Sequence, residues 1–286
     1  MELLKSCLAP FVKRKLSMLG LMFLGLIIFF AASAPFIVPY DPLVMDPIGR
    51  LASPNWSHWF GTDHFGRDTF SRVVYGSRLA LLIGTGVVTF SLATGVPIGV
   101  VSALYPRIGL LLMRGVDLMM AFPSLLLALG LIVILGQGVS NAILAIGVVY
   151  LTTTARLTYS VALRLKAETY VEAGLSMGGN VWWLATRHVV PNLVSPLLVQ
   201  ASFVFAFAQL GAASLDFLGL GAPPDVPSWG NMLAESRRFI TRAPWLLFFP
   251  GVMIVLTAFS LNLVGDAMRD RLDPRFRDEL ANKGKP

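Results

Sequence analysis

A pattern for covalent catalysis stands near the middle of the chain. Residues 174–178, GLSMG, match the G-x-S-x-G sequence that places a nucleophilic serine in many hydrolases, and His188 follows downstream. That arrangement requires a strand before the serine and a helix after it. Here the preceding residues, ETYVEA, are charged and favour a helix. A hydrolase with a reactive Ser176 is therefore a minor alternative.

Other catalytic and metal-binding patterns are missing from the sequence. His58, His64 and His188 are scattered without ligand spacing, and the single cysteine, Cys7, allows no internal disulfide. Neither H-E-x-x-H nor G-x-x-x-x-G-K-[ST] occurs, so the metalloprotease and P-loop nucleotide-binding signatures are absent. We therefore expect no catalytic residue, cofactor or metal on this chain.

Asp117 is the ionisable residue nearest the middle of a long apolar run. Arg114 stands three residues earlier on the same helical face, where the two side chains can pair. A charge inside a membrane is a functional candidate, whereas a charge pair at the inner mouth of a helix is the structural alternative. Together with Pro123, these residues are the candidates for a pathway or gate. A proton-coupled secondary transporter would need more buried acids and bases.

The elements that carry these residues are long and apolar. Hydrophobic residues make up 55% of the 286-residue chain and charged residues only 14%, against about 25% in soluble domains. The run between Asp117 and Arg156 would be about 57 Å long as one helix, and a helix needs only about 30 Å to cross the hydrocarbon. The polar residues 136–141, GQGVSN, divide it into two helices. We therefore predict an all-α membrane protein with six transmembrane helices. The uncharged runs are 16–38, 79–106, 118–155, 193–215 and 246–265.

The distribution of Lys and Arg predicts the orientation. With the N-terminus in the cytoplasm, sixteen of the 23 Lys and Arg residues lie on the inner side and seven on the outer side. This predicts cytoplasmic termini (1–15 and 269–286), with residues 39–78 outside the cell. The first apolar run exceeds a signal peptide's core and is followed by Pro35, so we expect an uncleaved span. The net charge of +7 then reflects topology, and nucleic-acid binding is not expected.

The largest inner loop, residues 164–192, is half polar. Residues 168–177 favour a helix, Gly178 and Gly179 end it, and Asn180 is a candidate cap for a second short helix that ends before Pro191. Trp182 and Trp183 would then be exposed. From the residues alone, this loop is equally a docking knob for a partner or an amphipathic pair on the inner leaflet.

The loop resembles that of a known family. EAGLSMG at 172–178, followed by RHVVPNL, is similar to the E-A-A-x-x-x-G loop of inner-membrane permease subunits of binding-protein-dependent ABC importers. Gly174 departs from the family's second alanine. Four further blocks resemble the dipeptide, oligopeptide and nickel permeases in particular. These blocks are GTDHFGRDTFSRVVYGSR at 61–78, RGVDLMMAFPSLLLAL at 114–129, DFLGLGAPPDVPSWGNML at 216–233 and NLVGDAMRDRLDPR at 262–275.

The resemblance implies a type I ABC importer-like permease fold, with residues 16–38 as the first span and 79–268 as the core permease domain. It implies three kinds of partner: a second homologous permease, two ABC ATPases that bind ATP and Mg²⁺, and an extracytoplasmic substrate-binding protein. The cargo implied is a di- or oligopeptide, with nickel chelates, glutathione and opines as alternatives. The ATPase-coupling residues implied are Glu168, Glu172, Ala173, Gly174, Gly178, Trp182, Arg187, His188 and Pro191. The outer residues expected to face the binding protein are Gly61, Thr62, Asp63, Gly66, Arg67, Asp68 and Trp229.

Overall fold

The computed structural model describes residues 15–272, which are helical apart from their connecting loops and a single bridge between Thr62 and Asp68. The predictions for Cys7 and for most of the two terminal segments lie outside these residues. The α-helices are α2 (Lys15–Ile37), α3 (Thr69–Leu104), α4 (Pro106–Met120), α5 (Ser124–Leu135), α6 (Val139–Lys166), α7 (Thr169–Ser176), α8 (Val181–Leu184), α9 (Val190–Phe217), α10 (Trp229–Ser236) and α11 (Trp245–Leu272). A π-helical turn (Ala185–Val189) joins α8 to α9, and a short 3₁₀ helix (Arg237–Phe239) follows α10.

Five helices are long and apolar enough to cross a membrane, and α4 with α5 makes a sixth span if the bent pair counts as one. The sequence predicts one helix for the third span, whereas the structure divides it into α4 and α5. The span is bent by 98° between Met120 and Ser124. Pro123 has no N–H to donate and disfavours helical geometry at the residue before it, so the helix ends there. The predicted break between α5 and α6 is confirmed, since Gly136 and Gly138 have φ of +88° and +135°.

Two helix boundaries differ from the prediction. The second span begins at Thr69, ten residues before its predicted start at Leu79, because Asp68 caps it by accepting a hydrogen bond from the Ser71 N–H at 2.8 Å. The second difference is that the helix after Asn180 does not end before Pro191. It continues as one apolar stretch, Trp182–Phe217, because proline in the first turn of α9 needs no N–H partner.

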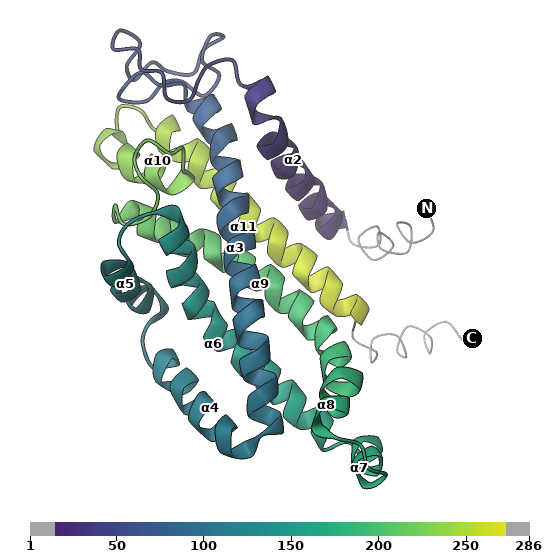
Figure 1. The fold of residues 1–286 in the computed structure, drawn as a ribbon. Coiled ribbons are helices and arrows are strands. Elements are labelled where there is room, and N and C mark those ends of the chain that lie inside the picture. Colours follow the sequence, from purple (N-terminus) through teal and green to yellow (C-terminus); the bar gives the residue numbers. More distant parts are fainter. Residues whose placement is uncertain (1–14, 273–286) are drawn as a thin grey trace, which may run out of the picture.

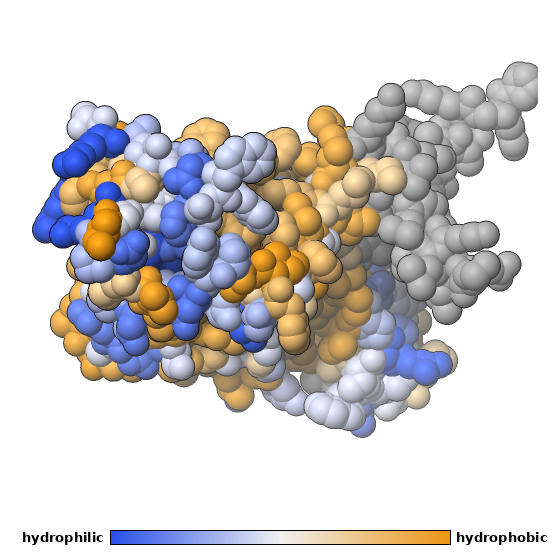
Figure 2. All heavy atoms as spheres, turned by 90° about the horizontal axis from the view of Figure 1, so that it is seen from above, coloured by the Kyte–Doolittle hydropathy of each residue, from blue (hydrophilic) through white to orange (hydrophobic). Residues whose placement is uncertain are grey.

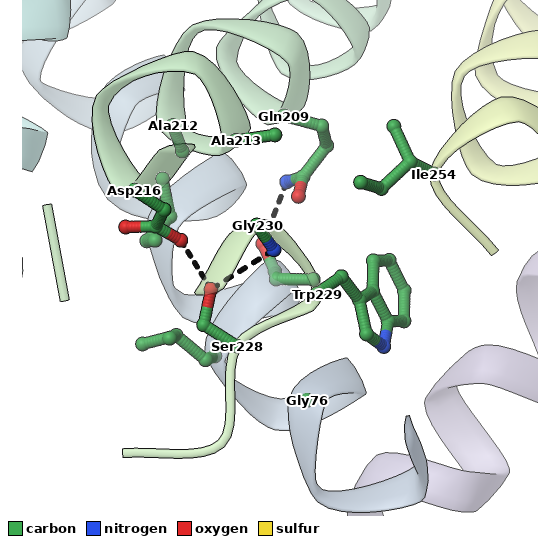
Figure 3. Close-up of a pocket in the computed structure, with 12 residues that line it drawn as sticks. Gly76, Gln209, Ala212, Ala213, Asp216, Ser228, Trp229, Gly230 and Ile254 are labelled. Carbon is green, nitrogen blue, oxygen red and sulfur yellow. Dashed lines mark hydrogen bonds between the residues drawn. The ribbon is translucent and has the colours of Figure 1, made fainter. Parts of the chain in front are cut away.

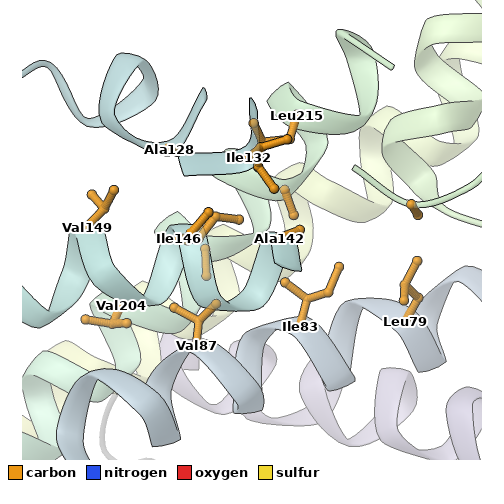
Figure 4. Packing of buried hydrophobic residues seen from close by; sticks show 14 residues of the cluster. Leu79, Ile83, Val87, Ala128, Ile132, Ala142, Ile146, Val149, Val204 and Leu215 are labelled. Carbon is orange, nitrogen blue, oxygen red and sulfur yellow. The ribbon is translucent and has the colours of Figure 1, made fainter. Parts of the chain in front are cut away.

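The centre of the bundle is the contact between α3 and α6 (Figure 1). Gly95 and Gly99 let these helices approach closely. A Cβ at Gly95 would lie 2.9 Å from the Leu151 carbonyl oxygen, and one at Gly99 would lie 2.6 Å from that of Ala155. The glycine pair therefore permits the close contact between α3 and α6. Above it, apolar side chains from α3, α5, α6 and α9 interlock in the main core (Figure 4).

The two ends of the bundle differ in character. The 38–68 loop and α10 lie at one end, and α7 and α8 lie at the other, toward which α2 begins and α11 ends (Figure 1). Seen from the first end, hydrophilic residues gather over the loops and α10, whereas hydrophobic residues cover the flank near α2 (Figure 2). The segments that the charge distribution assigns to one side of the membrane therefore share one end of the bundle.

Candidate functional site

The inner loop is a short helix, a glycine turn and a capped second helix. Gly178 has φ of +96°, a conformation that side chains with a Cβ rarely adopt, and no atom lies within 4 Å of the position of its missing Cβ. The Gly179 N–H donates to the carbonyl of Gly174 at 3.0 Å, which closes the turn. The Asn180 side chain accepts a hydrogen bond from the Trp183 N–H at 2.8 Å, so its predicted capping role is confirmed.

The inner face of this loop is anchored to the bundle. Val171 and Leu184 are fully buried and pack with Ala103 and Leu104 at the end of α3 and with Val161 of α6. The loop therefore packs directly against the two helices at the centre of the fold.

Trp183 explains why residue 174 is a glycine. A Cβ at Gly174 would lie 2.4 Å from the Trp183 ring, and one at Gly179 would lie 2.9 Å from it. The ring occupies the space that an alanine side chain would need. The prediction that both tryptophans are exposed is therefore wrong for Trp183, which is half-buried, and correct for Trp182, which is 75% exposed.

The exposed residues of the loop include three large apolar or aromatic side chains. Tyr170, Met177 and Trp182 are exposed. Five further predicted residues of the loop and its continuation are also exposed, namely Glu168, Ala173, Gly178, Arg187 and Pro191. Glu172 lies on α7, four residues before the end of this helix at Ser176. His188 is half-buried, with its ring centroid 4.5 Å from that of Trp183.

The same loop rules out the hydrolase arrangement. Ser176 is the last residue of α7, so a helix and not a strand leads into the serine. The nucleophile turn of hydrolases requires the strand.

A second candidate region lies where α4 breaks from α5. Asp117 forms an ion pair with Arg156 of α6, and not with Arg114, which is the partner that the sequence predicts. Spacing along one helix identified Arg114, but the packing of α4 on α6 brings Arg156 to the carboxylate. Next to this pair are two adjoining pockets of about 370 and 210 Å³. Both are lined by Ser124, Val149, Tyr150 and Phe207.

A third region, at the loop end of the bundle, is a buried charge cluster. Arg67 contacts Asp63 at 2.5 Å and Glu235 of α10 at 2.8 Å. Arg72 is 1% exposed, and its guanidinium lies 3.6 Å from each of the same two carboxylates. Asp63, His64 and Glu235 lie close enough together to hold a cation. The two carboxylates are already neutralised by two arginines, however, so the cluster is a salt-bridge network and not a cation site. Burial lowers the pKa of His64, against the opposing effect of Glu235 and Asp63.

The block at 216–233 also has buried polar and aromatic residues, namely Asp216, Ser228 and Trp229. Trp229 is 4% exposed, and its Nε1–H donates to the Val73 carbonyl at 2.9 Å. Asp216 accepts a hydrogen bond from the Ser228 hydroxyl (Figure 3). It also accepts one at 2.7 Å from the Ala222 N–H, which ties the loop after α9 back onto that helix. Gly76 makes room for the indole, because a Cβ there would lie 2.6 Å from it.

These contacts correct one expectation about the outer residues. All seven that the sequence places against a binding protein have buried side chains or backbone, and they hold the outer end together. They are Gly61, Thr62, Asp63, Gly66, Arg67, Asp68 and Trp229. The exposed hydrophobic residues of the same end include Ile48, Trp56 and Phe65, of which Ile48 and Trp56 are 97% and 96% exposed. No spacing rule marks them, because they stand in a loop without periodicity.

The fold and these regions define a multi-pass helical membrane protein with a protruding, anchored loop at one end. Residues 95–278 match the model of the binding-protein-dependent transport system inner membrane component, and residues 3–54 match the N-terminal TM domain of oligopeptide transport permease C. The chain belongs to this family of inner-membrane transport permeases.

Similar curated proteins cover nearly the whole chain. It is 41% identical to a dipeptide transport system permease protein DppC of Alkalihalophilus pseudofirmus, over 93% of this chain and 88% of that one. It is 41% identical to a di/tripeptide transport system permease protein DppC of Pseudomonas aeruginosa, over 96% and 93%. A glutathione transport system permease protein GsiD of Pectobacterium atrosepticum is 37% identical, over 93% and 89%.

Proposed function

We propose that this chain is one of two non-identical permease subunits of an ATP-driven importer for di- or oligopeptides. The cargo is supported by the peptide permeases at 41% identity, and the glutathione permease at 37% supports a small peptide as the alternative. The chain performs no covalent chemistry, and ATP and Mg²⁺ bind to two partner ATPases. An extracytoplasmic binding protein delivers the cargo.

The inner loop is the observation that supports coupling to the ATPases. Tyr170, Met177 and Trp182 present an exposed contact face, while Val171 and Leu184 fix the opposite face to α3 and α6. A partner that moves the exposed face therefore moves the helices at the centre of the bundle. Glu172 and Gly178 stand in the part of the loop that would enter an ATPase cleft.

The Asp117–Arg156 pair supports a pathway along α4, α5, α6 and α9. The side chains of Asp117 and Arg156 are 46% and 41% exposed in the isolated chain, at a depth where charges are costly in lipid. This face must therefore contact water or protein and not lipid. The adjoining pockets, which have neutral polar groups on Ser124 and Tyr150, supply room for cargo beside the bend at Pro123.

For the orientation, we propose that the end with α7 is cytoplasmic, together with both termini. The excess of Lys and Arg assigned to that side supports this orientation. We further propose that residues 79–268 are the core permease domain and that α2 is an added span. Separate family models for 3–54 and 95–278 support this division.

The test is reconstitution of the four-component complex with its binding protein. ATP-driven uptake of a dipeptide is expected only when all subunits are present, and this chain alone should transport nothing. Uptake by this chain alone, or a complete complex that hydrolyses ATP without moving peptide, would refute the proposal. Replacing Trp182 by Ala should reduce ATPase binding, whereas replacing the exposed Trp56 at the opposite end should leave it unchanged.

A further inference from the structure

The Asp117–Arg156 ion pair is isolated from the other charge pairs of the structure. Within residues 15–272, the remaining ion pairs all belong to the outer end, among His58, Asp63, Arg67, Asp68, Arg72 and Glu235. This pair instead joins two helices of the bundle. It is the one interaction of opposite charges that links α4 to α6 within the described residues.

The position of the pair along α4 and α6 follows from the bounds of these two helices. Asp117 is 11 residues from the start of α4 at Pro106, and Arg156 is 10 residues from the end of α6 at Lys166. At 1.5 Å per residue these positions are both about 15–17 Å from the ends of the helices that face α7. The pair therefore lies about three turns inside each helix, within the segments that are candidate membrane spans.

The pair lies beside the bend between α4 and α5 and beside the larger of the two adjoining pockets. Just beyond Asp117, α4 ends and the chain bends by 98° before α5, so the end of α4 is not held by a continuous helix. One turn from Arg156, Thr152 lines the larger pocket, and Met120 lines it from α4. The ion pair thus bridges the two helices on the side of this pocket that faces the α7 end.

The strength of the pair suits a contact that opens repeatedly. Both side chains are nearly half exposed, and ion pairs that keep contact with water contribute little net stability. Breaking the pair is therefore feasible within a transport cycle, provided that both charges stay hydrated or meet new partners.

We propose that the Asp117–Arg156 ion pair is a latch between α4 and α6, which closes the inner side of the pathway at rest and opens in each transport cycle. This inference rests on the proposed function, because it assumes that cargo passes along this face. Asp117 and Arg156 act as positioning residues, because their ion pair holds α4 against α6. This contact between the two helices restricts the passage of cargo.

The test uses the complete complex in liposomes preloaded with a labelled dipeptide and no ATP. Asp117→Asn and Arg156→Gln should each release peptide several-fold faster than wild type. The exchange Asp117→Arg with Arg156→Asp should return release toward the wild-type rate, because it restores an ion pair with reversed direction. Arg107→Gln, an exposed arginine on the same helix, is the matched control and should not leak.

The outcomes separate the latch from a structural role. If the single variants assemble with all subunits and do not leak, or if the exchanged pair leaks as much as they do, the latch is refuted. Variants that fail to assemble are replaced by Asp117→Glu, which keeps the charge on a longer side chain and should leak less than Asp117→Asn. ATP-driven uptake by the wild-type complex in the same liposomes tests the proposed function separately.

Discussion

Replacing Gly178 by Val tests the coupling role of the inner loop most directly. The φ of +96° disfavours any residue with a Cβ by about 1–2 kcal/mol, and a β-branched residue is the least tolerated there. No atom lies within 4 Å of the added Cβ, so the Cβ itself meets no neighbour and the backbone conformation is the cause of the expected strain. The ratio of the native turn to alternative turns should therefore fall by roughly 5–30-fold.

The expected result is loss of coupling with retention of assembly in the membrane. Gly178 lies outside the spans, so the variant should insert and pair with the second permease normally. Peptide uptake should fall, and hydrolysis of ATP should lose its stimulation by the loaded binding protein. Gly178→Asn should retain more activity, because asparagine tolerates left-handed conformations better than valine does.

A matched control separates strain from the presence of a bulkier side chain. Gly25 on α2 also has no atom within 4 Å of its missing Cβ, but it lies within a regular helix, where valine is accepted. Gly25→Val should therefore transport as wild type does. If Gly178→Val shows wild-type uptake and wild-type stimulation, the loop is a surface feature and the coupling argument is wrong.

Three further predictions concern packing, topology and pH. Gly99→Val should lower the thermal stability of the purified chain by about 1–3 kcal/mol or prevent assembly, because its Cβ would lie 2.6 Å from the Ala155 carbonyl oxygen; unchanged melting would contradict the tight α3–α6 contact. A cysteine at the exposed Ser57 should react with an impermeant thiol reagent on intact cells while Cys7 does not, and the reverse labelling would invert the topology. The pKa of His64 is lowered on folding, so its contribution to stability is complete above the unfolded value of about 6.5 and is lost as the pH falls below it. Unfolding of the outer end should therefore be easier in acid. The variant His64→Gln should lack that part of the pH dependence.

Local features of the inner loop were predictable because their causes are local. A glycine pair ends a helix where side chains are disfavoured, and Asn180 caps the next helix through its own side chain. The apolar runs likewise give the positions of the spans, since the length of an uncharged segment directly measures its ability to cross the bilayer. The close approach at Gly95 and Gly99 follows from the absence of side chains at two positions on one helical face.

The outer motifs could not be interpreted correctly from their sequence. Their charged and aromatic residues suggested a surface for a partner, but Arg67, Arg72 and Trp229 are internal. A loop without periodicity carries no signal for which side chains point inward. Burial here depends on Glu235 and Val73, which come from distant parts of the chain.

By itself, the sequence determined the number of apolar segments, the break between the α5 and α6 helices and the turn at Gly178, because hydrophobic length and backbone preference act within a few residues. The tertiary structure alone decided that Asp117 pairs with Arg156 and not with Arg114, and that Trp183 covers Gly174. Each of these depends on which surfaces meet when helices pack. Spacing along a single helix specifies the candidates for a contact, but the packing of a second helix against it selects among them.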